Sequence, residues 1–296
     1  MSKVNLPTKI YRGILRILPI KPALYLIYFR GYKKILDLKN PKTWGEKIQW
    51  LKLYGGLEEL SPYVDKYEVR NYVKNTIGEE YLNELIGVYD DVESINFDKL
   101  PNEFVLKSTN GSGTVLICNN KKNFDIIKAK KVMKCWLKDK NYYKEKKEFQ
   151  YKNIKNRIII EKYLQNKNNS LTDYKFYCFN GKVEYYAIFY DRYTNKSIDI
   201  YDKDNNKIKD AKVCNIPNSN YEIEDYHIID KMKKLSEKLS KIFSCVRVDF
   251  YCIDDKPIFG ELTFTDGAGS DPWNPKNFDL NIAKKIKLKK IISEGK

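Results

Sequence analysis

Histidine is almost absent from this sequence, which has one, His227, among 296 residues. Histidine is the usual general base of catalytic triads and a frequent metal ligand, so a histidine-dependent triad or a histidine-rich metal site is nearly excluded. Catalysis in this chain has to rely on lysine, arginine, carboxylates and a bound metal. His227 itself stands among polar residues before a helical pattern, where we expect a surface or capping role.

Cysteine pairs and long apolar runs are also missing. The six cysteines include no C-x-x-C motif and mostly lie in apolar, strand-like segments, which predicts reduced core thiols in a cytosolic protein, without disulfides or zinc. No segment approaches the ~18 uninterrupted apolar residues of a membrane span. No small-residue cleavage site follows the N-terminal segment, so we do not expect export.

Acidic residues are in the minority, with 39 Asp and Glu against 55 Lys and Arg, for a net charge of +16. A basic chain attracts anions such as nucleotides, acidic polymers, lipid headgroups or nucleic acid. Much of the excess is lysine in a sequence rich in Asn and Ile, a bias that an AT-rich genome also produces. No nucleic-acid-binding module accompanies it, so we discount the charge as a nucleic-acid signal.

Helical patterns come first in the chain. Residues 9–38 alternate apolar and basic residues and are broken by two prolines. A helical arm packed on the domain is the favoured interpretation, and a basic amphipathic helix on a membrane face stays open. Residues 43–54 predict a helix with Thr43 as N-cap and Glu46 as its capping-box partner. Further helices are expected at 64–77, 123–148 and 228–242.

Apolar runs between turn signals predict strands, several of them paired as hairpins. The expected strands are 83–89, 104–107, 114–118, 157–164, 173–179, 183–190, 245–253 and 257–263. Two polar segments separate them: residues 166–171 are predicted to form a loop, and residues 191–225 a turn-rich surface excursion.

One predicted hairpin, FVLKSTNGSGTVLIC at 104–118, has the features of a phosphate-binding turn. Gly111 and Gly113 leave backbone N–H groups open to phosphate oxygens, and Lys107 adds a positive charge beside them. The combination suits the phosphates of ATP. Asn-Gly and Ser-Gly are also ordinary hairpin turns, and on these residues alone that interpretation stays open.

A second candidate site lies on the last pair of predicted strands. Alternation places Arg247 and Asp249 on one face of their strand, and Glu261 and Thr263 on one face of the next. Two carboxylates brought together there would fit Mg²⁺, which prefers carboxylate and phosphate oxygens. Unrelated, solvent-facing carboxylates would give the same pattern, so both interpretations stay open.

Taken in chain order, these segments resemble the ATP-grasp superfamily, most closely its TupA-like members, which are encoded among genes for bacterial surface polysaccharides and teichuronopeptides. The matching segments are Lys66, the glycine turn after Lys107, IIIEKYL at 158–164, DYK at 173–175, RVD at 247–249 and ELT at 261–263. The likeness runs from about Lys39 to Ala283 and includes TWGEKIQWLKLY, VDKYEVRNYV and FGELTFTDGAGSDP.

The resemblance implies an α+β, ATP-grasp fold in which two α+β subdomains grip ATP between antiparallel sheets, behind an N-terminal helical region. The implied division is a helical arm at 1–60, an α/β segment at 61–102 that packs on the ligase core, a subdomain with the glycine-turn lid at 103–165, and a C-terminal subdomain with the metal site at 166–296.

The resemblance also implies residue roles. Lys66 and Lys107 would contact the phosphates, the glycine turn would cover them, 161–164 would form the adenine hinge, and Asp173 would lie near the ribose. The full nucleotide-binding set is Lys66, Lys107, Ser108, Gly111, Ser112, Gly113, Glu161, Lys162, Tyr163, Leu164 and Asp173.

The remaining roles concern catalysis. Lys175 and Arg247 would act on the transferred phosphoryl group, and Asp249 and Glu261 would hold Mg²⁺. Thr263 stands where many ATP-grasp enzymes carry Asn, a better ligand for a second magnesium ion. A loop that usually faces the acyl acceptor matches Asp266, Gly267 and Gly269.

The implied activity is an ATP- and Mg²⁺-dependent carboxylate-amine ligase. Its implied substrates are a uronic-acid carboxylate of a surface polysaccharide or its precursor, and an amine or amino acid. We expect a cytoplasmic protein and leave open peripheral contact with an anionic inner membrane face.

Two alternatives come from other classes. One is a glycosyltransferase, although the closest approach to a D-x-D motif is Asp202 to Asp204 in a polar segment. The other is a non-catalytic, membrane-associated anion-binding module that uses residues 9–38. A protein kinase is not indicated, because H-R-D and D-F-G segments are absent.

Overall fold

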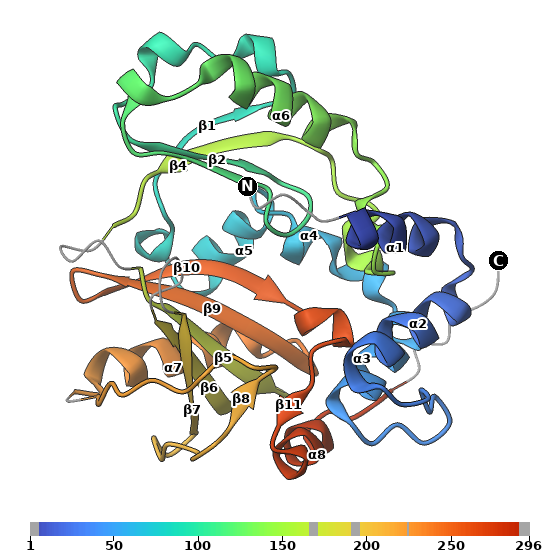
Figure 1. The fold of residues 1–296 in the computed structure, drawn as a ribbon. Coiled ribbons are helices and arrows are strands. Elements are labelled where there is room, and N and C mark those ends of the chain that lie inside the picture. Colours follow the sequence, from blue (N-terminus) through green and yellow to red (C-terminus); the bar gives the residue numbers. More distant parts are fainter. Residues whose placement is uncertain (1–5, 166–170, 191–195, 224, 290–296) are drawn as a thin grey trace.

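The computed structural model describes residues 6–165, 171–190, 196–223 and 225–289. Two main antiparallel sheets lie one above the other, and helices α1 (Leu6–Ile17), α2 (Ile20–Tyr32) and α3 (Trp44–Tyr54) run along one side of them (Figure 1). The predicted α+β fold with an N-terminal helical region is confirmed. No helix within the described ranges is long and apolar enough to cross a membrane.

The upper sheet of Figure 1 has the order β1-β4-β2-β3. Its strands are β1 (Leu85–Tyr89), β4 (Ile158–Lys162), β2 (Phe104–Ser108) and β3 (Val115–Cys118). Strand β4 lies between β1 and β2, and its run of three isoleucines is fully buried. β-Branched residues such as isoleucine are enriched in strands of this kind. Helix α6 (Ile126–Lys138) covers the sheet and contributes Met133 and Trp136 to its core.

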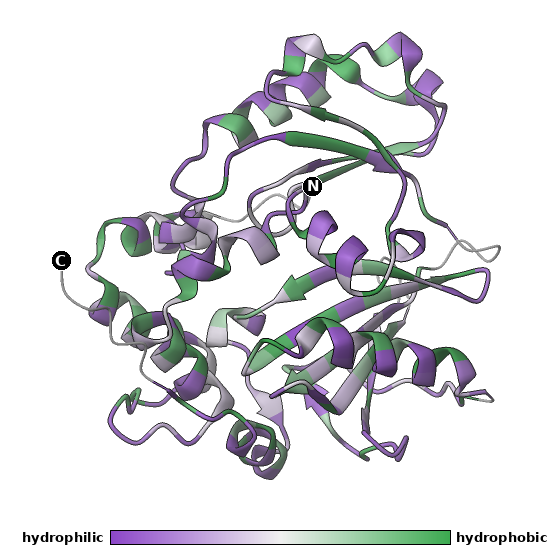
Figure 2. Ribbon diagram, turned by 180° about the vertical axis from the view of Figure 1, so that it is seen from behind, coloured by the Kyte–Doolittle hydropathy of each residue, from purple (hydrophilic) through white to green (hydrophobic). Residues whose placement is uncertain are grey.

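The lower sheet has the order β10-β9-β5-β6-β7. Its strands are β10 (Lys256–Thr263), β9 (Cys245–Ile253), β5 (Asp173–Phe179), β6 (Lys182–Tyr190) and β7 (Ser197–Asp202). Successive residues of β5 enter opposite cores: Phe176 packs with helix α7 (His227–Ser240), whereas Tyr177 packs with Trp44 and with helix α8 (Lys276–Lys284). Hydrophobic and hydrophilic residues alternate in bands along the covering helices (Figure 2). A two-stranded sheet of β8 (Lys212–Val213) and β11 (Trp273–Asn274) completes the fold.

Helix α3 begins at the residue that the sequence indicates. The Thr43 hydroxyl accepts a hydrogen bond from the Glu46 amide at 3.2 Å, and the Glu46 carboxylate accepts one from the Thr43 amide at 2.8 Å. The predicted capping box is therefore confirmed.

The predicted continuous helix at 64–77 is wrong. The structure has two short helices, α4 (Ser61–Val64) and α5 (Val69–Thr76), separated by a turn. The Asp65 carboxylate accepts hydrogen bonds from the amides of Tyr67 at 2.8 Å and Glu68 at 3.2 Å, so a side chain takes the place of helical carbonyls. This turn is what brings Lys66 out of the helix and toward the glycine turn.

The predicted helix at 123–148 is too long. Helix α6 ends at Lys138, and the Asp139 carboxylate then accepts the Asn141 amide at 3.1 Å in a turn. Short 3₁₀ segments follow, including Tyr142–Lys144.

Of the predicted surface excursion at 191–225, residues 191–195 and 224 lie outside the described ranges. For the rest the prediction is wrong, because Ser197–Asp202 forms the edge strand β7. Its Ile198 and Ile200 are fully buried. The polar residues on either side hide the alternation of SIDIYD. Of the predicted loop at 166–171, residues 166–170 lie outside the described ranges, and the domain boundaries stay predictions.

Candidate active site

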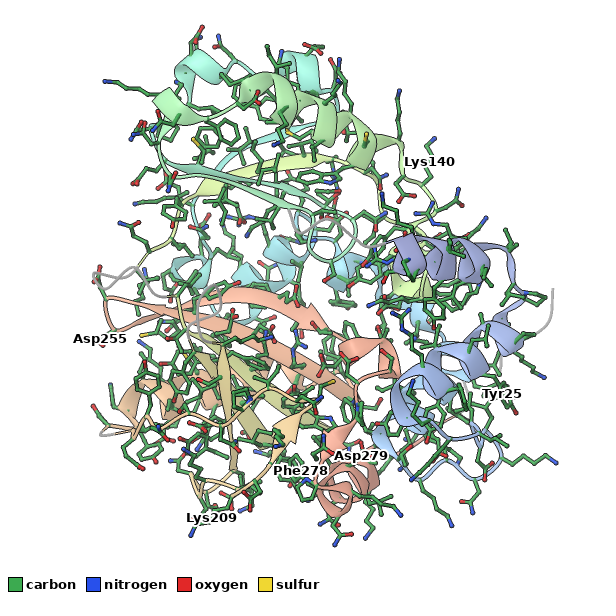
Figure 3. The ribbon with its side chains drawn as sticks, viewed as in Figure 1. Tyr25, Lys140, Lys209, Asp255, Phe278 and Asp279 are labelled. Atoms are coloured by element: carbon green, nitrogen blue, oxygen red, sulfur yellow. The ribbon has the colours of Figure 1, made fainter. Side chains whose placement is uncertain are left out.

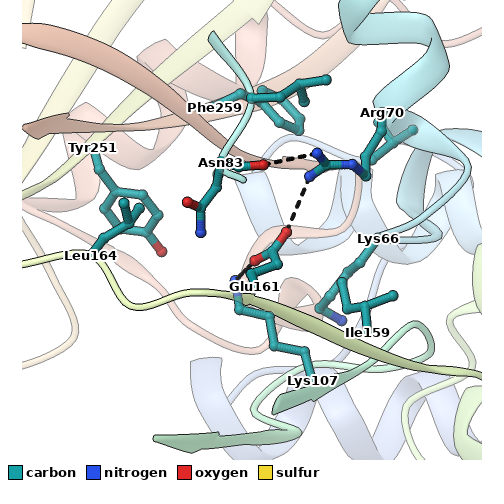
Figure 4. A pocket seen from close by; sticks show the side chains of 12 residues that line it. Lys66, Arg70, Asn83, Lys107, Ile159, Glu161, Leu164, Tyr251 and Phe259 are labelled. Atoms are coloured by element: carbon teal, nitrogen blue, oxygen red, sulfur yellow. Dashed lines mark hydrogen bonds and ion pairs between the residues drawn. The ribbon is translucent and has the colours of Figure 1, made fainter. Parts of the chain in front are cut away.

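A pocket lies between the two main sheets (Figure 4). The upper sheet contributes Lys107, Ile159 and Glu161, and the lower sheet contributes Tyr251, Phe259 and Gly260. The remaining lining residues, Lys66, Val69, Arg70, Leu82, Asn83 and Leu164, come from the connecting segments and helix α5, whose Val69 packs in the core of the lower sheet. The glycine-turn strand and the late acidic strand pair, far apart in the chain, therefore border one pocket.

Glu161 is the charged centre of the upper wall. Its buried carboxylate accepts a hydrogen bond from Lys107 at 2.6 Å and one from Arg70 at 3.3 Å, and Arg70 also donates to the Asn83 carbonyl at 2.8 Å (Figure 4). A buried carboxylate without such partners would be costly, so the two cations stabilise it. The cross-strand partner of Glu161 is Val105, and Lys107 lies two positions further along the same strand. The side chains of Lys107 and Glu161 are therefore on the same face of the sheet.

The proposed hinge residues 162–164 are placed differently from one another. The Lys162 amide donates to the Glu84 carbonyl at 3.0 Å, and its own carbonyl accepts from Asn83 at 2.9 Å, while its side chain is exposed. Tyr163 is half-buried and does not line the pocket, whereas Leu164 does. Asp173 is buried at the start of β5, opposite the pocket residue Tyr251.

Two contacts hold the glycine turn. The Lys66 ammonium donates to the Gly111 carbonyl at 2.5 Å, and the Ser112 amide donates to the Tyr142 hydroxyl at 3.0 Å. Ser108 is buried at the end of β2, with its amide bonded to the Thr114 carbonyl at 3.2 Å. Lys66 and the turn, both predicted at the phosphates, are thus brought together.

We expect Gly111→Ala to weaken ATP binding more than Gly113→Ala. Both glycines have positive φ, +87° and +76°, so each substitution costs about 1 kcal/mol of stability. A Cβ at Gly111 would lie 3.1 Å from the Tyr142 ring, whereas one at Gly113 meets nothing within 4 Å. Only Gly111→Ala therefore displaces the contact that holds Ser112. Thermal unfolding and ATP titration of both variants measure the two effects, and equal losses of ATP affinity would contradict this expectation.

The cluster on the lower sheet is centred on the buried Arg247. Its guanidinium donates to both oxygens of Asp249 at 2.6 and 2.7 Å, to Glu261 at 2.9 Å, and to Asp266. Lys175 on β5 donates to the same Asp249 carboxylate. Glu261 lies directly opposite Asp249 in the strand pair, so the predicted grouping of two carboxylates beside a cation is confirmed.

The contacts within the cluster favour the charged forms of Arg247 and Asp249. Burial alone would lower the pKa of Arg247, but Asp249 and Asp266 raise it well above its usual value. Burial would likewise raise the pKa of Asp249, but Arg247 and Lys175 lower it below its usual value. The cluster thus holds fixed charges on β9 and β10, the strands whose Tyr251, Phe259 and Gly260 line the pocket.

The residues present fit a magnesium ion that is held with phosphate oxygens. The Glu261 side chain is 46% exposed, and its Oε2 accepts no hydrogen bond from a described residue, whereas Asp249 is 6% exposed and engaged at both oxygens. Mg²⁺ is commonly bound by one or two carboxylates plus substrate phosphates. The described ranges contain no group of three or more His, Cys, Asp or Glu arranged as a complete cage. The Thr263 hydroxyl donates to Glu261 at 2.9 Å.

The predicted acceptor loop divides into two parts. Asp266 belongs to the Arg247 cluster and accepts the Tyr177 hydroxyl at 3.0 Å. Gly269 packs instead against α3, where its carbonyl accepts from Gln49 at 3.0 Å and an added Cβ would lie 2.7 Å from the same amide. Gly267, with φ of +57°, makes the turn between them.

Eight of the twelve pocket residues were missed from the sequence, and Arg70 and Tyr251 are two of them. Arg70 lies four residues after Lys66, a spacing that places both on one face of the helix predicted at 64–77 and would have included Arg70. Tyr251 lies two residues after Asp249 on β9, so the alternation that grouped Arg247 with Asp249 would have included it.

Two antiparallel sheets that face one another across a pocket, one bearing lysines and the other a carboxylate–arginine cluster, are the architecture of the ATP-grasp class. A family model described as TupA-like ATPgrasp matches residues 46–287. The chain belongs to this family. The predicted family membership is therefore confirmed.

Solved structures with a similar arrangement include several ligases. D-alanine–D-alanine ligase from Bacillus anthracis has 18% identity and a TM-score of 0.42, with coverage of 71% of this chain and 64% of that one. Phosphoribosylamine–glycine ligase from Thermotoga maritima has 15% identity and a TM-score of 0.42, with coverage of 78% of this chain and 57% of that one. L-amino acid ligase from Bacillus licheniformis has 14% identity and a TM-score of 0.41, with coverage of 68% of this chain and 43% of that one. This chain thus spans less than two thirds of each. A comparison with curated proteins gave no match.

Proposed function

We propose that this protein is an ATP-dependent carboxylate-amine ligase. The observation that carries the proposal is the pocket bordered by both sheets, with Lys66 and Lys107 on one side and the strand of Glu261 on the other. Lys66 is close enough to Glu261 for the Glu261 carboxylate to raise the pKa of the Lys66 ammonium. Lysines in one pocket, with the carboxylate of Glu261 on the strand that borders it, would complement the charges of a magnesium–nucleotide complex.

The reaction needs positioning and charge neutralisation, without a protein nucleophile. A substrate carboxylate oxygen attacks the γ-phosphorus of ATP, and the bond to the bridging oxygen breaks and releases ADP. The amine then attacks the acyl carbon, phosphate leaves, and the amine proton passes to solvent. Lys66 and Lys107 bind the phosphates, and Arg247 and Lys175 steady the transferred group. Mg²⁺ held by Glu261 and Asp249 supplies neutralising charge when bound.

Nucleotide binding has to rearrange the upper wall. Lys107 is paired with Glu161, so its ammonium must leave that carboxylate to reach a phosphate. The freed carboxylate then accepts the adenine amino group, and Arg70 remains to balance its charge. Asp173, opposite the pocket residue Tyr251, is assigned to the ribose. The backbone of residues 162–164 is assigned to the base edge, with Tyr163 and Leu164 as its open part, because the amide and carbonyl of Lys162 are bonded to Glu84 and Asn83.

Lys66 gives the proposed nucleotide site a pH dependence. Desolvation lowers its pKa to about 8, helped by Lys107 and opposed by Glu261. The ammonium that attracts phosphate is therefore present below that pH and lost above it. We expect ATP affinity to fall by roughly tenfold between about pH 7 and pH 9.5. Lys66→Arg should bind equally over this range because arginine stays charged, and an unchanged fall in that variant would contradict the assignment.

For the substrates, we propose a uronic-acid carboxylate of a surface polysaccharide or its precursor, and an amine or amino acid. The net charge of +16 supports an acidic glycan. We further propose a cytoplasmic location, supported by six free cysteines, with peripheral contact at the inner membrane face.

The test is coupled ADP detection over a panel of uronates and amines, followed by mass measurement of the products. The proposal expects ADP release that requires both substrates, and a product with a new amide. Products that carry a phosphate ester and no amide would contradict it. Glu184→Gln, which changes a carboxylate paired with Lys285 away from the pocket, is the matched control.

The structure does not support the glycosyltransferase alternative, because the Asp202 to Asp204 segment forms a turn away from the pocket. Asp202 accepts the amides of Asp204 and Asn206, each at 2.9 Å, and so closes a turn after β7. No residue of this turn lines the pocket between the sheets. Consumption of a nucleotide sugar without ATP would restore that alternative.

A further inference from the structure

Helix α1 is oriented with its charged side toward the protein. Arg16 is paired with Asp139 at 2.9 Å and with Glu145 at 2.7 Å, and Arg12 lies 3.6 Å from the same Glu145. Partly buried pairs that share partners fix a helix more firmly than single exposed ones. Electrostatic contacts therefore hold α1 to the segment that follows α6.

The opposite side of α1 is an apolar stripe exposed to solvent. Ile10, Ile14 and Ile17 are 56%, 43% and 83% exposed, at the spacing of one helix face. Gly13 lies between them, and a Cβ added there would meet nothing within 4 Å. Helix α1 buries Leu15 in the core that it shares with α2, so the exposed stripe is a second apolar side, which a surface helix of a globular protein normally lacks.

Helix α2 extends this surface. Its Tyr25, Leu26 and Phe29 are also exposed, and Tyr25 projects at the edge of the molecule (Figure 3). The two helices pack together, with Arg30 stacked on the Tyr11 ring at 4.3 Å. Of the eleven exposed large hydrophobic residues in the described ranges, seven lie between positions 10 and 35. We call the six on α1 and α2 the N-terminal apolar surface.

The charge around this surface is strongly positive. The first 42 residues contain ten Lys or Arg and one acidic residue, Asp37. Lys9, Lys21 and Arg30 are exposed on α1 and α2, and Lys33 and Lys34 directly after them. A second copy of the chain on this face would oppose like charges, which disfavours a symmetric dimer. An anionic surface with an apolar interior complements both properties.

We propose that the N-terminal apolar surface docks on an anionic lipid bilayer, with α1 lying in the interface plane. Isoleucine, phenylalanine and tyrosine side chains enter the boundary between headgroups and acyl chains, and the surrounding lysines and arginines bind lipid phosphates. The inference rests on the peripheral location proposed above and is independent of the ligase chemistry.

The test is co-sedimentation of the full chain with vesicles of phosphatidylcholine alone or mixed equally with phosphatidylglycerol. We expect binding to the mixed vesicles only, weakened by high salt. The triple variant Ile10→Gln, Ile14→Gln, Ile17→Gln should lose roughly tenfold or more of its affinity. Ile127→Gln and Ile242→Gln, which change exposed isoleucines elsewhere, are matched controls and should bind as wild type does.

Several outcomes would overturn the inference. The first is that wild type binds neither vesicle type, or binds both equally. The second is that the triple variant binds mixed vesicles with the affinity of wild type. The third is that wild type sediments as a dimer and the triple variant as a monomer. Lys9→Gln combined with Lys21→Gln tests the same surface without changing its apolar residues and should lower affinity for mixed vesicles by about tenfold. ATP binding by these variants, measured without vesicles, separates failure of docking from failure of the ligase assignment.

Discussion

Glu261→Gln should abolish nearly all ATP-dependent turnover while the protein stays folded. Glu261 is the accessible carboxylate of the lower cluster and has an oxygen that no described residue engages. The amide keeps the shape of the side chain and an acceptor for Arg247, but it removes the charge that binds Mg²⁺. Loss of one preorganised charge at a reacting phosphoryl group costs about 100- to 1,000-fold in rate.

Turnover and Mg²⁺-dependent ATP binding measure this effect, and thermal unfolding checks the fold. Glu184→Gln on β6 removes a carboxylate from the same sheet and is expected to leave turnover unchanged. Asp249→Asn should reduce turnover as well, but with a clear loss of stability, because Asp249 is buried against Arg247 and Lys175. Wild-type Mg²⁺ affinity in Glu261→Gln would contradict the metal assignment.

Arg247→Met should both destabilise the protein and eliminate turnover. The guanidinium is buried and donates to three carboxylates, so its removal leaves Asp249 and Asp266 without their main compensation. Breaking a buried ion pair by removing one partner costs about 3–5 kcal/mol of unfolding free energy. Arg247→Lys keeps the charge but not the bidentate geometry, and it should recover part of the stability and little of the turnover.

The pH dependence of stability gives an independent check. Arg247 holds the pKa of Asp249 low, so in Arg247→Met that pKa rises and the carboxylate takes up a proton at a higher pH. The stability difference between wild type and Arg247→Met should therefore shrink as pH falls from about 7 to 4. Urea unfolding at several pH values measures it, and a constant difference would count against the role of Arg247 as charge compensator.

Local patterns in the sequence were sufficient for much of the fold. The capping box of α3, the hairpin turns and the alternation along β9 and β10 all depend on residues a few positions apart. The break at Asp65 and the edge strand β7 were missed. In the first case a side chain replaces helical carbonyls, and in the second burial by distant elements outweighs polar flanking residues.

In the candidate site, too, local patterns could be predicted from the sequence and tertiary contacts could not. The grouping of Arg247, Asp249 and Glu261 follows from strand periodicity, because one hairpin carries all three. The pairing of Glu161 with Lys107 and Arg70 joins three separate elements, and nothing in the spacing of these residues indicates it. The outward-facing apolar stripe of α1 is a further example, since periodicity defines the stripe but tertiary contacts decide which way it points.

The central claim is that one magnesium nucleotide binds between the two sheets. The most direct test is a crystal structure of the protein with Mg²⁺ and a non-hydrolysable ATP analogue. We predict the adenine beside Glu161 and Leu164, the phosphates between Lys66, Lys107 and Arg247, and the metal on Glu261. A nucleotide bound outside this pocket, or a metal ion held away from both Asp249 and Glu261, would contradict the account.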